Sequence, residues 1–344
     1  MKALLVKTSS IGDLLHTLPA VTDAQRARPD LRFDWVVEEG LRAVPGWHPA
    51  VERVITVAYR KWRFRPLNGL FGGPLAAFRQ ELRRETYDRV IDAQGLYKSA
   101  VITRLALGER HGLDLASCRE KLAPLAYQRR HAVPRGQHAV QRLRALFALA
   151  LDYPLPATAP DYGIDRARLP PPPLPGRYLA FLHGTAWTSK LWPESHWRGL
   201  AALAAAGGYR IALPFQGARD EGRARRIAAG IEAVQPVNTP TLEAAAGLIA
   251  GAAGAVAVDT GLGHLAAALG VATVSLYGPT GAARTGTVGR GQEHLESRLP
   301  CAPCRNKICN LTGRPHLPSP CLQGLTDGQA WLRLVAALAP PRPA

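Results

Sequence analysis

The stretch Asp259-Thr260-Gly261-Leu262-Gly263-His264 follows a short apolar run and directly precedes a helical pattern. In the first half of the chain, Lys7-Thr8-Ser9-Ser10-Ile11-Gly12-Asp13 occupies the same kind of position. A strand, a tight polar turn and a helix start together form a corner that binds anions. One such corner in each half predicts two α/β domains that face each other across a cleft, each supplying part of one site.

Apolar runs alternate with helical patterns along the chain, which is typical of parallel α/β layers. The predicted strands are residues 3–6, 33–37, 53–57, 89–92, 178–182, 209–213, 255–258 and 273–276. The predicted helices are residues 13–28, 75–84, 194–206, 219–229, 242–250, 263–269 and 327–338.

A proline run, Leu169-Pro170-Pro171-Pro172-Pro173-Leu174-Pro175, interrupts this alternation. Because proline lacks the backbone donor that helices and central strands need, the run predicts an interdomain linker. A chain of 344 residues is also too long for one ordinary core. We expect an N-terminal domain at 1–168, the linker at 169–176, a C-terminal domain at 177–326, and a final helix with its tail at 327–344.

The composition is that of a globular protein, with 47% hydrophobic and 20% charged residues. The start of the chain reaches Lys7 and Asp13 too soon for a signal peptide. The longest low-charge stretch, 244–258, is shorter than a membrane span. We therefore expect a soluble, cytosolic protein.

The net charge of +17 predicts an anionic partner such as nucleic acid, a phosphorylated lipid or a nucleotide. The alternative is an arginine-rich composition that serves only solubility. No basic cluster lies on a recognisable recognition helix, which disfavours nucleic acid. The basic residues gather in the N-terminal half, so that this domain is expected to meet the larger anion: Arg60, Lys61, Arg63, Arg65, Arg79, Arg83, Arg84, Arg129, Arg130, Arg135, Arg142 and Arg144.

Four of the five cysteines, Cys301, Cys304, Cys309 and Cys321, lie in one proline-rich stretch. In a cytosolic chain a C-x-x-C pair with two further cysteines favours zinc over disulfides. The second tight pair of a zinc ribbon is missing, however. A metal here would have a structural role, and no metal is expected in the reaction.

Two single residues carry chemical hypotheses. Asp13 directly follows Gly12, and its carboxylate is either a helix N-cap or a general base, since ligands of such sheets bind beyond the carboxyl ends of the strands. Lys190 lies in the loop after strand 178–182, where it reaches a phosphate beside the backbone donors of Gly184 and Thr185, or is simply solvated.

The loop at 259–264 offers several ligands at once. Its glycines, including Gly261, let backbone amides approach a pyrophosphate at the positive end of a helix. Thr260 can donate to a phosphate oxygen, Asp259 can accept from sugar hydroxyls, and His264 lies in the first helical turn, where packing or capping is the alternative. Asp220 and Glu221 fit ribose binding, although the first turn of a helix also favours acids.

Several segments together resemble the bacterial lipopolysaccharide heptosyltransferases, a family of GT-B glycosyltransferases. The likeness is closest to the branch that adds the first heptose to Kdo-lipid A; heptosyltransferase II or a member with another donor or acceptor is the alternative. The segments that carry it are Lys7 to Ala20, Phe33-Asp34-Trp35-Val36-Val37-Glu38-Glu39, Val90 to Leu96, Lys190-Leu191-Trp192-Pro193-Glu194, Asp259 to Leu265 and Tyr277-Gly278-Pro279-Thr280.

The resemblance implies two Rossmann-like domains and the donor ADP-L-glycero-β-D-manno-heptose, held mainly by the C-terminal domain. It implies that Lys190 and the backbone at Thr260 and Gly261 hold the diphosphate, with Asp259 and His264 beside it. An acid near strand 209–213 would hold the ribose, and Asp220 and Glu221 both remain candidates. Asp13 matches the family's general base, which deprotonates a Kdo hydroxyl for attack with inversion.

The resemblance also gives the basic N-terminal residues a purpose. Arg60, Lys61, Arg63, Arg65 and Arg119 would bind Kdo carboxylates and lipid A phosphates. A polybasic surface of this kind favours an anionic cytoplasmic leaflet, so we expect peripheral association with the cytoplasmic face of the inner membrane. The cysteine stretch is not something that the family's chemistry requires.

Overall fold

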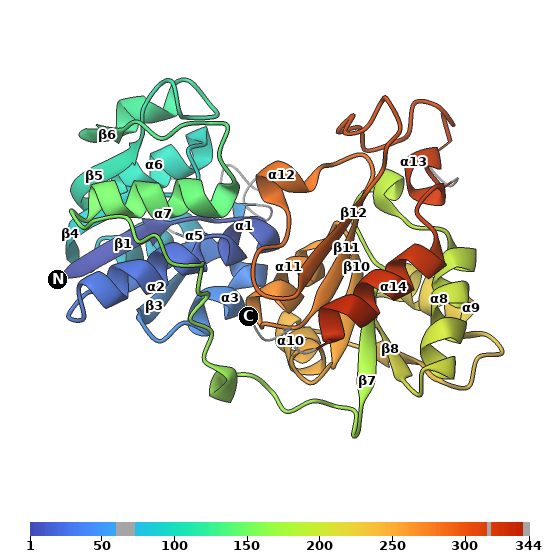
Figure 1. Ribbon diagram of the computed structural model, residues 1–344. Helices are drawn as coiled ribbons and strands as arrows, with labels where there is room; N and C mark the ends of the chain where they lie inside the picture. Colours follow the sequence, from blue (N-terminus) through green and yellow to red (C-terminus); the bar gives the residue numbers. More distant parts are fainter. Residues whose placement is uncertain (60–72, 315–317, 340–344) are drawn as a thin grey trace. The chain divides into compact units, whose positions relative to one another are not determined.

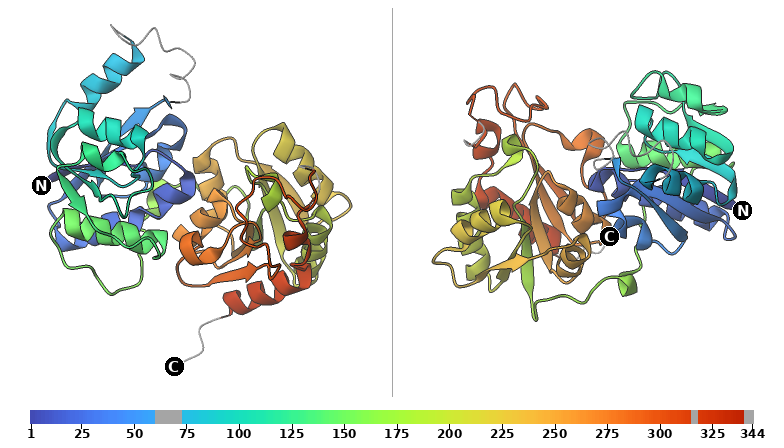
Figure 2. Two further views of the ribbon diagram at one scale, coloured as in Figure 1. Left: turned by 90° about the horizontal axis from the view of Figure 1, so that it is seen from above. Right: turned by 180° about the vertical axis from the view of Figure 1, so that it is seen from behind.

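The computed structural model describes residues 1–59, 73–314 and 318–339 (Figure 1). The chain divides into two compact units, Met1–Asp165 and Arg166–Ala344. Each unit contains one six-stranded sheet with helices on both of its faces (Figure 2). The expected α/β fold with two Rossmann-like sheets is confirmed.

In the first unit all strand pairs are parallel, in the order β3-β2-β1-β4-β5-β6. Its strands are β1 (Lys2–Val6), β2 (Arg32–Glu38), β3 (Val51–Val57), β4 (Thr86–Asp92), β5 (Leu107–Leu113) and β6 (Arg129–His131). Its helices are α1 (Ile11–Leu15), α2 (Leu18–Ala27), α3 (Ala43–Gly46), α5 (Pro74–Leu82), α6 (Tyr97–Leu105) and α7 (Ala139–Ala150), with short 3-10 turns η1 (Glu39–Leu41) and η3 (Ala123–Ala126).

Burial on both faces explains the apolar run of β1, in which Ala3, Leu4, Leu5 and Val6 are fully buried. On one face of the sheet of the first unit, α2 and α7 pack side by side (Figure 1). A buried ion pair joins these two helices, with Arg144 Nε 2.5 Å from Asp23 Oδ2.

The second unit repeats the topology in the order β12-β11-β10-β7-β8-β9, again with parallel pairs. Its strands are β7 (Tyr178–Leu182), β8 (Arg210–Phe215), β9 (Val234–Asn238), β10 (Gly254–Val258), β11 (Thr273–Tyr277) and β12 (Gln292–Glu296). Its helices are α8 (Glu194–Ala206), α9 (Ala218–Ala228), α10 (Leu242–Ala250), α11 (Gly261–Ala268), α12 (Ala282–Thr285), α13 (Pro320–Gln323) and α14 (Asp327–Leu338), with 3-10 turns η4 (Arg166–Arg168) and η5 (Thr188–Lys190).

Both sheets reverse their winding direction at one place, between β1 and β4 in the first unit and between β7 and β10 in the second. At such a switch point the loops after the two strands leave in opposite directions, and the opening between them is where α/β sheets bind ligands. The two loops that drew attention in the sequence follow β1 and β10, so both lie at a switch point.

One predicted helix differs from the structure, and several observed elements were not predicted. The expected helix at 13–28 is two helices, because α1 ends at Leu15 and α2 begins at Leu18. Pro19 would remove a hydrogen bond from a continuous helix and clash with its preceding turn, but it is tolerated in the first turn of α2. The elements that were not predicted include the strands β5, β6, β9 and β12 and the helices α6 and α7. The charged strands β6 and β12 carry no apolar run, and both are edge strands.

The proline run forms neither helix nor strand, as its composition indicates. It is not detached from the second unit, however. A Cβ on Gly247 would lie 2.6 Å from the carbonyl oxygen of Pro170, and one on Gly251 would lie 2.5 Å from Pro172 Cβ. The prolines therefore pack against α10, and glycine is needed at these two contacts.

Candidate functional site

An ion pair occupies the switch point of the second unit. Lys190 ends the turn η5 after β7, and Asp259 directly follows β10. Lys190 Nζ lies 2.6 Å from Asp259 Oδ2, and both side chains are largely buried, with exposed fractions of 15% and 11%. The ammonium group also lies 4.4 Å from the centroid of the Trp187 ring. Lys190 is therefore held in one place, which contradicts the alternative of a simply solvated lysine.

Asp259 is itself fixed by the neighbouring loops. The hydroxyl of Thr280, which follows β11, donates to Asp259 Oδ2 over 2.6 Å. The hydroxyl of Thr185, after β7, donates to the Asp259 carbonyl oxygen over 3.4 Å. Loops after three neighbouring strands therefore meet at this one carboxylate. Thr280 and Trp187 were given no role from the sequence; the position of Thr280 at the end of the next strand was the signal that could have found it.

The remaining predicted ligands of this corner lie at the start of α11. Thr260 is the N-cap of α11 in an extended conformation, and its hydroxyl makes no capping hydrogen bond. Gly261 is the first helical residue, so the backbone N–H groups of the first turn lie at the carboxyl end of β10. His264 is buried, with Nε2 3.9 Å from Asp259 Oδ1. This corner can accept an anion through backbone amides and the positive end of a helix.

The structure separates the two candidate ribose ligands. Asp220 lies against the loop after β7, because a Cβ on Gly184 would be 3.0 Å from Asp220 Oδ2. Glu221 instead forms an ion pair with Arg225 one turn along α9, with Oε1 2.7 Å from Arg225 Nη2. Asp220 therefore lies beside the switch point, and Glu221 is paired on the helix surface.

The corner of the first unit carries Asp13 in α1. Asp13 Oδ2 accepts hydrogen bonds from the backbone N–H of Ser10 over 2.9 Å and from the Ser10 hydroxyl over 2.8 Å. The N-cap of α1 is Ser10, so the expectation that Asp13 might be the N-cap is wrong; Asp13 is the third helical residue. The carboxylate is half-buried and held by the loop in which it lies.

A buried lysine supports this corner. The ammonium group of Lys7 donates to the Ala93 carbonyl oxygen over 2.9 Å, and the side chain is almost fully buried. Burial lowers the pKa of Lys7, while the negative charges of Asp13 and Asp92 oppose that shift. Lys98 Nζ donates to the Ser9 hydroxyl over 3.0 Å, which adds a second cation to the loop.

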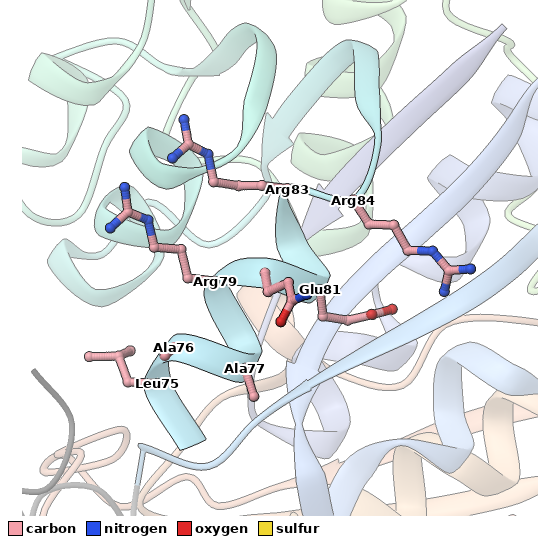
Figure 3. Close-up of a pocket in the computed structure, with 8 residues that line it drawn as sticks. Leu75, Ala76, Ala77, Arg79, Glu81, Arg83 and Arg84 are labelled. Atoms are coloured by element: carbon pink, nitrogen blue, oxygen red, sulfur yellow. The ribbon is translucent and has the colours of Figure 1, made fainter. Parts of the chain in front are cut away.

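Most of the predicted acceptor-binding residues lie outside the described residues: Arg60, Lys61, Arg63 and Arg65. Arg119 is exposed on the segment between β5 and η3. A surface depression at α5 contains three of the other basic residues; Arg79 and Arg83 point to one side of it and Arg84 to the other (Figure 3). None of the predicted site residues lines this depression.

The described part of the chain contains no group of three or more His, Cys, Asp or Glu side chains arranged to hold a metal ion. It also contains no helix with the length and apolar character that crossing a bilayer requires.

Comparison with known proteins connects this site to a family. The model of glycosyltransferase family 9 (heptosyltransferase) matches residues 75–314, a range that includes all the donor-site residues described above. The chain belongs to glycosyltransferase family 9. The resemblance seen in the sequence is thereby confirmed, and the protein is a heptosyltransferase.

Curated relatives of this family 9 enzyme are lipopolysaccharide heptosyltransferases. It is 53% identical over 311 residues to lipopolysaccharide heptosyltransferase 1 of Pseudomonas aeruginosa, covering 90% of this chain and 87% of the relative. It is 48% identical over 316 residues to the enzyme of the same name from Escherichia coli K12, and the match covers 91% of this chain and 97% of the relative. Identity to lipopolysaccharide heptosyltransferase 2 of that strain is 26% over 310 residues, and the match covers 81% of this chain and 83% of the relative.

Solved structures agree with these relatives. The E. coli heptosyltransferase WaaC with ADP has 48% sequence identity and a TM-score of 0.81, covering 86% of this chain and 92% of its own. WaaC with ADP-2-deoxy-2-fluoro heptose has a TM-score of 0.79 at the same identity, covering 86% and 93%. The expected GT-B fold and heptose transfer in lipopolysaccharide core synthesis are confirmed.

Proposed function

We propose that this enzyme transfers L-glycero-D-manno-heptose from ADP-heptose to a Kdo residue of Kdo-lipid A. The observation that carries the proposal is the Lys190–Asp259 pair at the switch point of the second unit, beside the start of α11. The WaaC structures with ADP and with a fluorinated ADP-heptose support the donor. Identity about twice as high to the heptosyltransferase 1 relatives as to heptosyltransferase 2 supports Kdo as the acceptor.

The donor diphosphate would be held by Lys190 and by the backbone amides at Thr260 and Gly261. An ammonium group carries three N–H donors, so Lys190 can contact a phosphate oxygen while it remains paired with Asp259. As the bond to the anomeric carbon breaks, charge grows on the leaving ADP, and a cation and helix-end amides already in position stabilise it. No metal is assigned to this step.

Asp220 is proposed as the ribose ligand and Asp259 and His264 as neighbours of the sugar and diphosphate. Asp220 fits because it lies against Gly184 in the loop after β7, whereas Glu221 is paired with Arg225. In this type of fold a carboxylate accepts a hydrogen bond from a ribose hydroxyl.

Asp13 is proposed as the general base. It would take the proton of the acceptor hydroxyl, whose oxygen then attacks the anomeric carbon from the side opposite ADP, so that the configuration inverts. Positioning favours this role, since two hydrogen bonds from Ser10 hold the Asp13 carboxylate. The buried side chain of Lys7 is near enough for its charge and that of Asp13 to interact, so a cation lies beside the proposed base.

The acceptor phosphates and Kdo carboxylates are assigned to Arg60, Lys61, Arg63, Arg65 and Arg119. Peripheral association with the anionic cytoplasmic face of the inner membrane is part of the same proposal. Its structural support is the exposed leucine segment, which we define as residues 115–125. There Leu115, Leu122 and Leu125 are 58%, 62% and 71% exposed, and Arg119 and Lys121 are exposed between them. Leucines flanked by cations fit an anionic bilayer surface.

The deciding experiment is a transfer assay with purified enzyme, ADP-L-glycero-β-D-manno-heptose and Kdo-lipid A. Product analysis should show one heptose added with inverted anomeric configuration. A parallel assay with an acceptor that already carries the first heptose tests the heptosyltransferase 2 alternative. Transfer only to that second acceptor would overturn the proposal.

A further inference from the structure

Four cysteines of the second unit line one small cavity. They are Cys301, Cys304, Cys309 and Cys321, and the other lining residues include Leu299, Leu311 and Pro320. Cys321 is buried against Gly278, where an added Cβ would lie 2.7 Å from its Sγ. All four are free thiols. A convergence of four thiols on one cavity is unusual for a protein whose only other cysteine, Cys118, is buried alone in the first unit.

The segment that carries these cysteines has little else to hold it together. The described residues between β12 and α13 form neither helix nor strand over residues 297–314 and 318–319. Loops of this length without secondary structure are uncommon in compact domains. Of its large apolar residues, Leu299 packs against the core of the second unit, whereas Ile308 and Leu311 are 47% and 67% exposed. Irregular segments with several cysteines can be held by a structural metal ion.

The environment of the thiols suits a cation. The four side chains line the same cavity, so binding to one ion would bring four thiolate charges together. Fully ionised thiols would need a positive charge among them, and a divalent ion supplies two. Arg305, Lys307 and Arg314 lie in the same segment and would offset the remaining negative charge.

We propose that Cys301, Cys304, Cys309 and Cys321 bind one zinc-class divalent ion as a structural site. Four thiolates are a donor set that selects zinc or iron over magnesium or calcium. As the side chains lie, no three donors in the described chain are arranged to hold an ion. Binding therefore requires the four thiols around the cavity to draw closer together, and the thiol protons leave to solvent as the metal–sulfur bonds form.

The cysteine segment also supports the donor site. The backbone N–H of Ser189 donates to the Lys307 carbonyl oxygen over 3.2 Å, and the Ser189 hydroxyl donates to the Asn306 carbonyl oxygen over 2.6 Å. Both bonds hold η5, the turn that ends in Lys190. The backbone N–H of Arg305 donates to the Pro279 carbonyl oxygen over 2.7 Å, next to Thr280. An ion that orders residues 301–309 would therefore also position Lys190 and Thr280.

Metal content is the first test. Enzyme purified without chelator should carry about one equivalent of zinc or iron per chain, by mass spectrometry of the metals. Cys309→Ser and Cys321→Ser should lose it, while Cys118→Ser, a matched cysteine of the first unit, should keep it. A wild-type protein that is metal-free and takes up no zinc when its thiols are reduced would overturn the proposal. Equal loss from Cys118→Ser would also overturn it, because the metal would then not depend on this cluster.

A second measurement avoids dependence on the folding of the variants. Wild-type enzyme is stripped with a chelator under reducing conditions and titrated with Co²⁺. One equivalent should produce the intense visible bands of tetrahedral cobalt together with a sulfur-to-metal charge-transfer band. Weak octahedral bands, or none, would contradict four-thiolate binding. Oxidation of the reduced thiols to disulfides without metal uptake would show that a covalent cross-link is formed instead.

The link to the donor site rests on the proposed function and is tested separately. Removing the metal should raise the KM for ADP-heptose several-fold and leave the KM for the acceptor nearly unchanged, and zinc should restore it. Metal binding without any effect on donor KM would retain the metal site and overturn its positioning role. Metal binding by a protein that transfers no heptose would instead count against the proposed function alone.

Discussion

Lys190 Nζ lies 2.6 Å from Asp259 Oδ2 at the place where the second sheet reverses its winding. The two residues come from loops after different strands, β7 and β10, which are neighbours in the sheet. Each is held from another loop, since Lys190 pairs with Asp259 and Thr280 donates to the Asp259 carboxylate, while Trp187 of the lysine's own loop lies under the ammonium group. The site is therefore preorganised to present one cation at the start of α11.

Lys190→Met should weaken donor binding and slow transfer. A lost charge-assisted hydrogen bond to phosphate costs about 1.5–3 kcal/mol, which corresponds to roughly a 10- to 100-fold weaker affinity. ADP affinity by calorimetry and donor KM are the measurements. Lys307→Met is the matched control, because Lys307 lies 6.0 Å from the same Trp187 ring and supports η5 only through its backbone. Equal effects of the two changes would show a general electrostatic role.

Asp220→Ala should weaken ADP binding about tenfold, since it removes the hydrogen bonds from the ribose hydroxyls to a carboxylate. Glu221→Ala should change ADP affinity less than about twofold, because Glu221 is an exposed partner of Arg225. Both affinities can be measured by calorimetry on the same preparation. The assignment fails if Glu221→Ala has the larger effect.

Asp13→Asn should reduce kcat by about 10²–10⁴-fold, the usual contribution of a general base. ADP affinity should stay unchanged, because the assigned donor ligands are all in the second unit. The amide oxygen can still accept the hydrogen bonds from Ser10, so unfolding measurements should show a change of no more than about 1 kcal/mol. Ser10→Ala, which removes one hydrogen bond but leaves the carboxylate, is the control. Near-normal turnover of Asp13→Asn would exclude the base assignment.

The exposed leucine segment makes membrane association testable. Leu122→Asp with Leu125→Asp should reduce co-sedimentation with phosphatidylglycerol vesicles, since two apolar contacts are lost and two negative charges face an anionic surface. Leu332→Asp on α14 is the matched control, because Leu332 and Leu125 are both 71% exposed. Equal loss from the control, or equal binding of the wild type to neutral phosphatidylcholine at high salt, would contradict an electrostatic surface on this segment.

His183 predicts a pH dependence of stability. Burial, and then the neighbouring Arg223, lowers the pKa of His183 from 6.5 to about 4. The folded state therefore takes up a proton less readily than the unfolded state. The contribution of the neutral side chain is complete above pH 6.5 and is lost as the pH falls toward 4. Between pH 7 and 5 the loss should be about 2 kcal/mol.

Urea unfolding at pH 7 and pH 5 measures this effect. His183→Asn should unfold with a smaller difference between the two pH values than the wild type. His196→Asn, at a partly exposed histidine of the same unit, should keep the wild-type difference. An unchanged pH dependence in His183→Asn would exclude this group as the source.

Local patterns were sufficient for much of the fold. The buried strands β1, β7, β10 and β11 appear in the sequence as apolar runs, because both faces of a parallel sheet are covered. The edge strands β6 and β12 are charged and partly exposed, so no periodicity marks them. Their positions in the sheets depend on which strands pair with each other. Such pairing joins residues that are far apart in the sequence.

The candidate site divides in the same way. The sequence alone placed Asp259, Thr260 and Gly261 at a corner between a strand and a helix start, because strand, turn and helix start are adjacent in the chain. It could not choose between Asp220 and Glu221, which are neighbours in one helical turn. Only the packing of α9 gives them different surroundings, since it places Asp220 against Gly184 and pairs Glu221 with Arg225, which is why Asp220 is the proposed ribose ligand.

The sequence by itself therefore determined the kinds of element, the two corners and the family. The tertiary structure decided which distant residues meet: Lys190 with Asp259 through the pairing of β7 with β10, and four cysteines around one cavity. The physical reason is that helix and strand preferences depend on neighbours along the chain. Charge pairs and metal-ligand sets instead depend on neighbours in space, which only the order of the strands brings together.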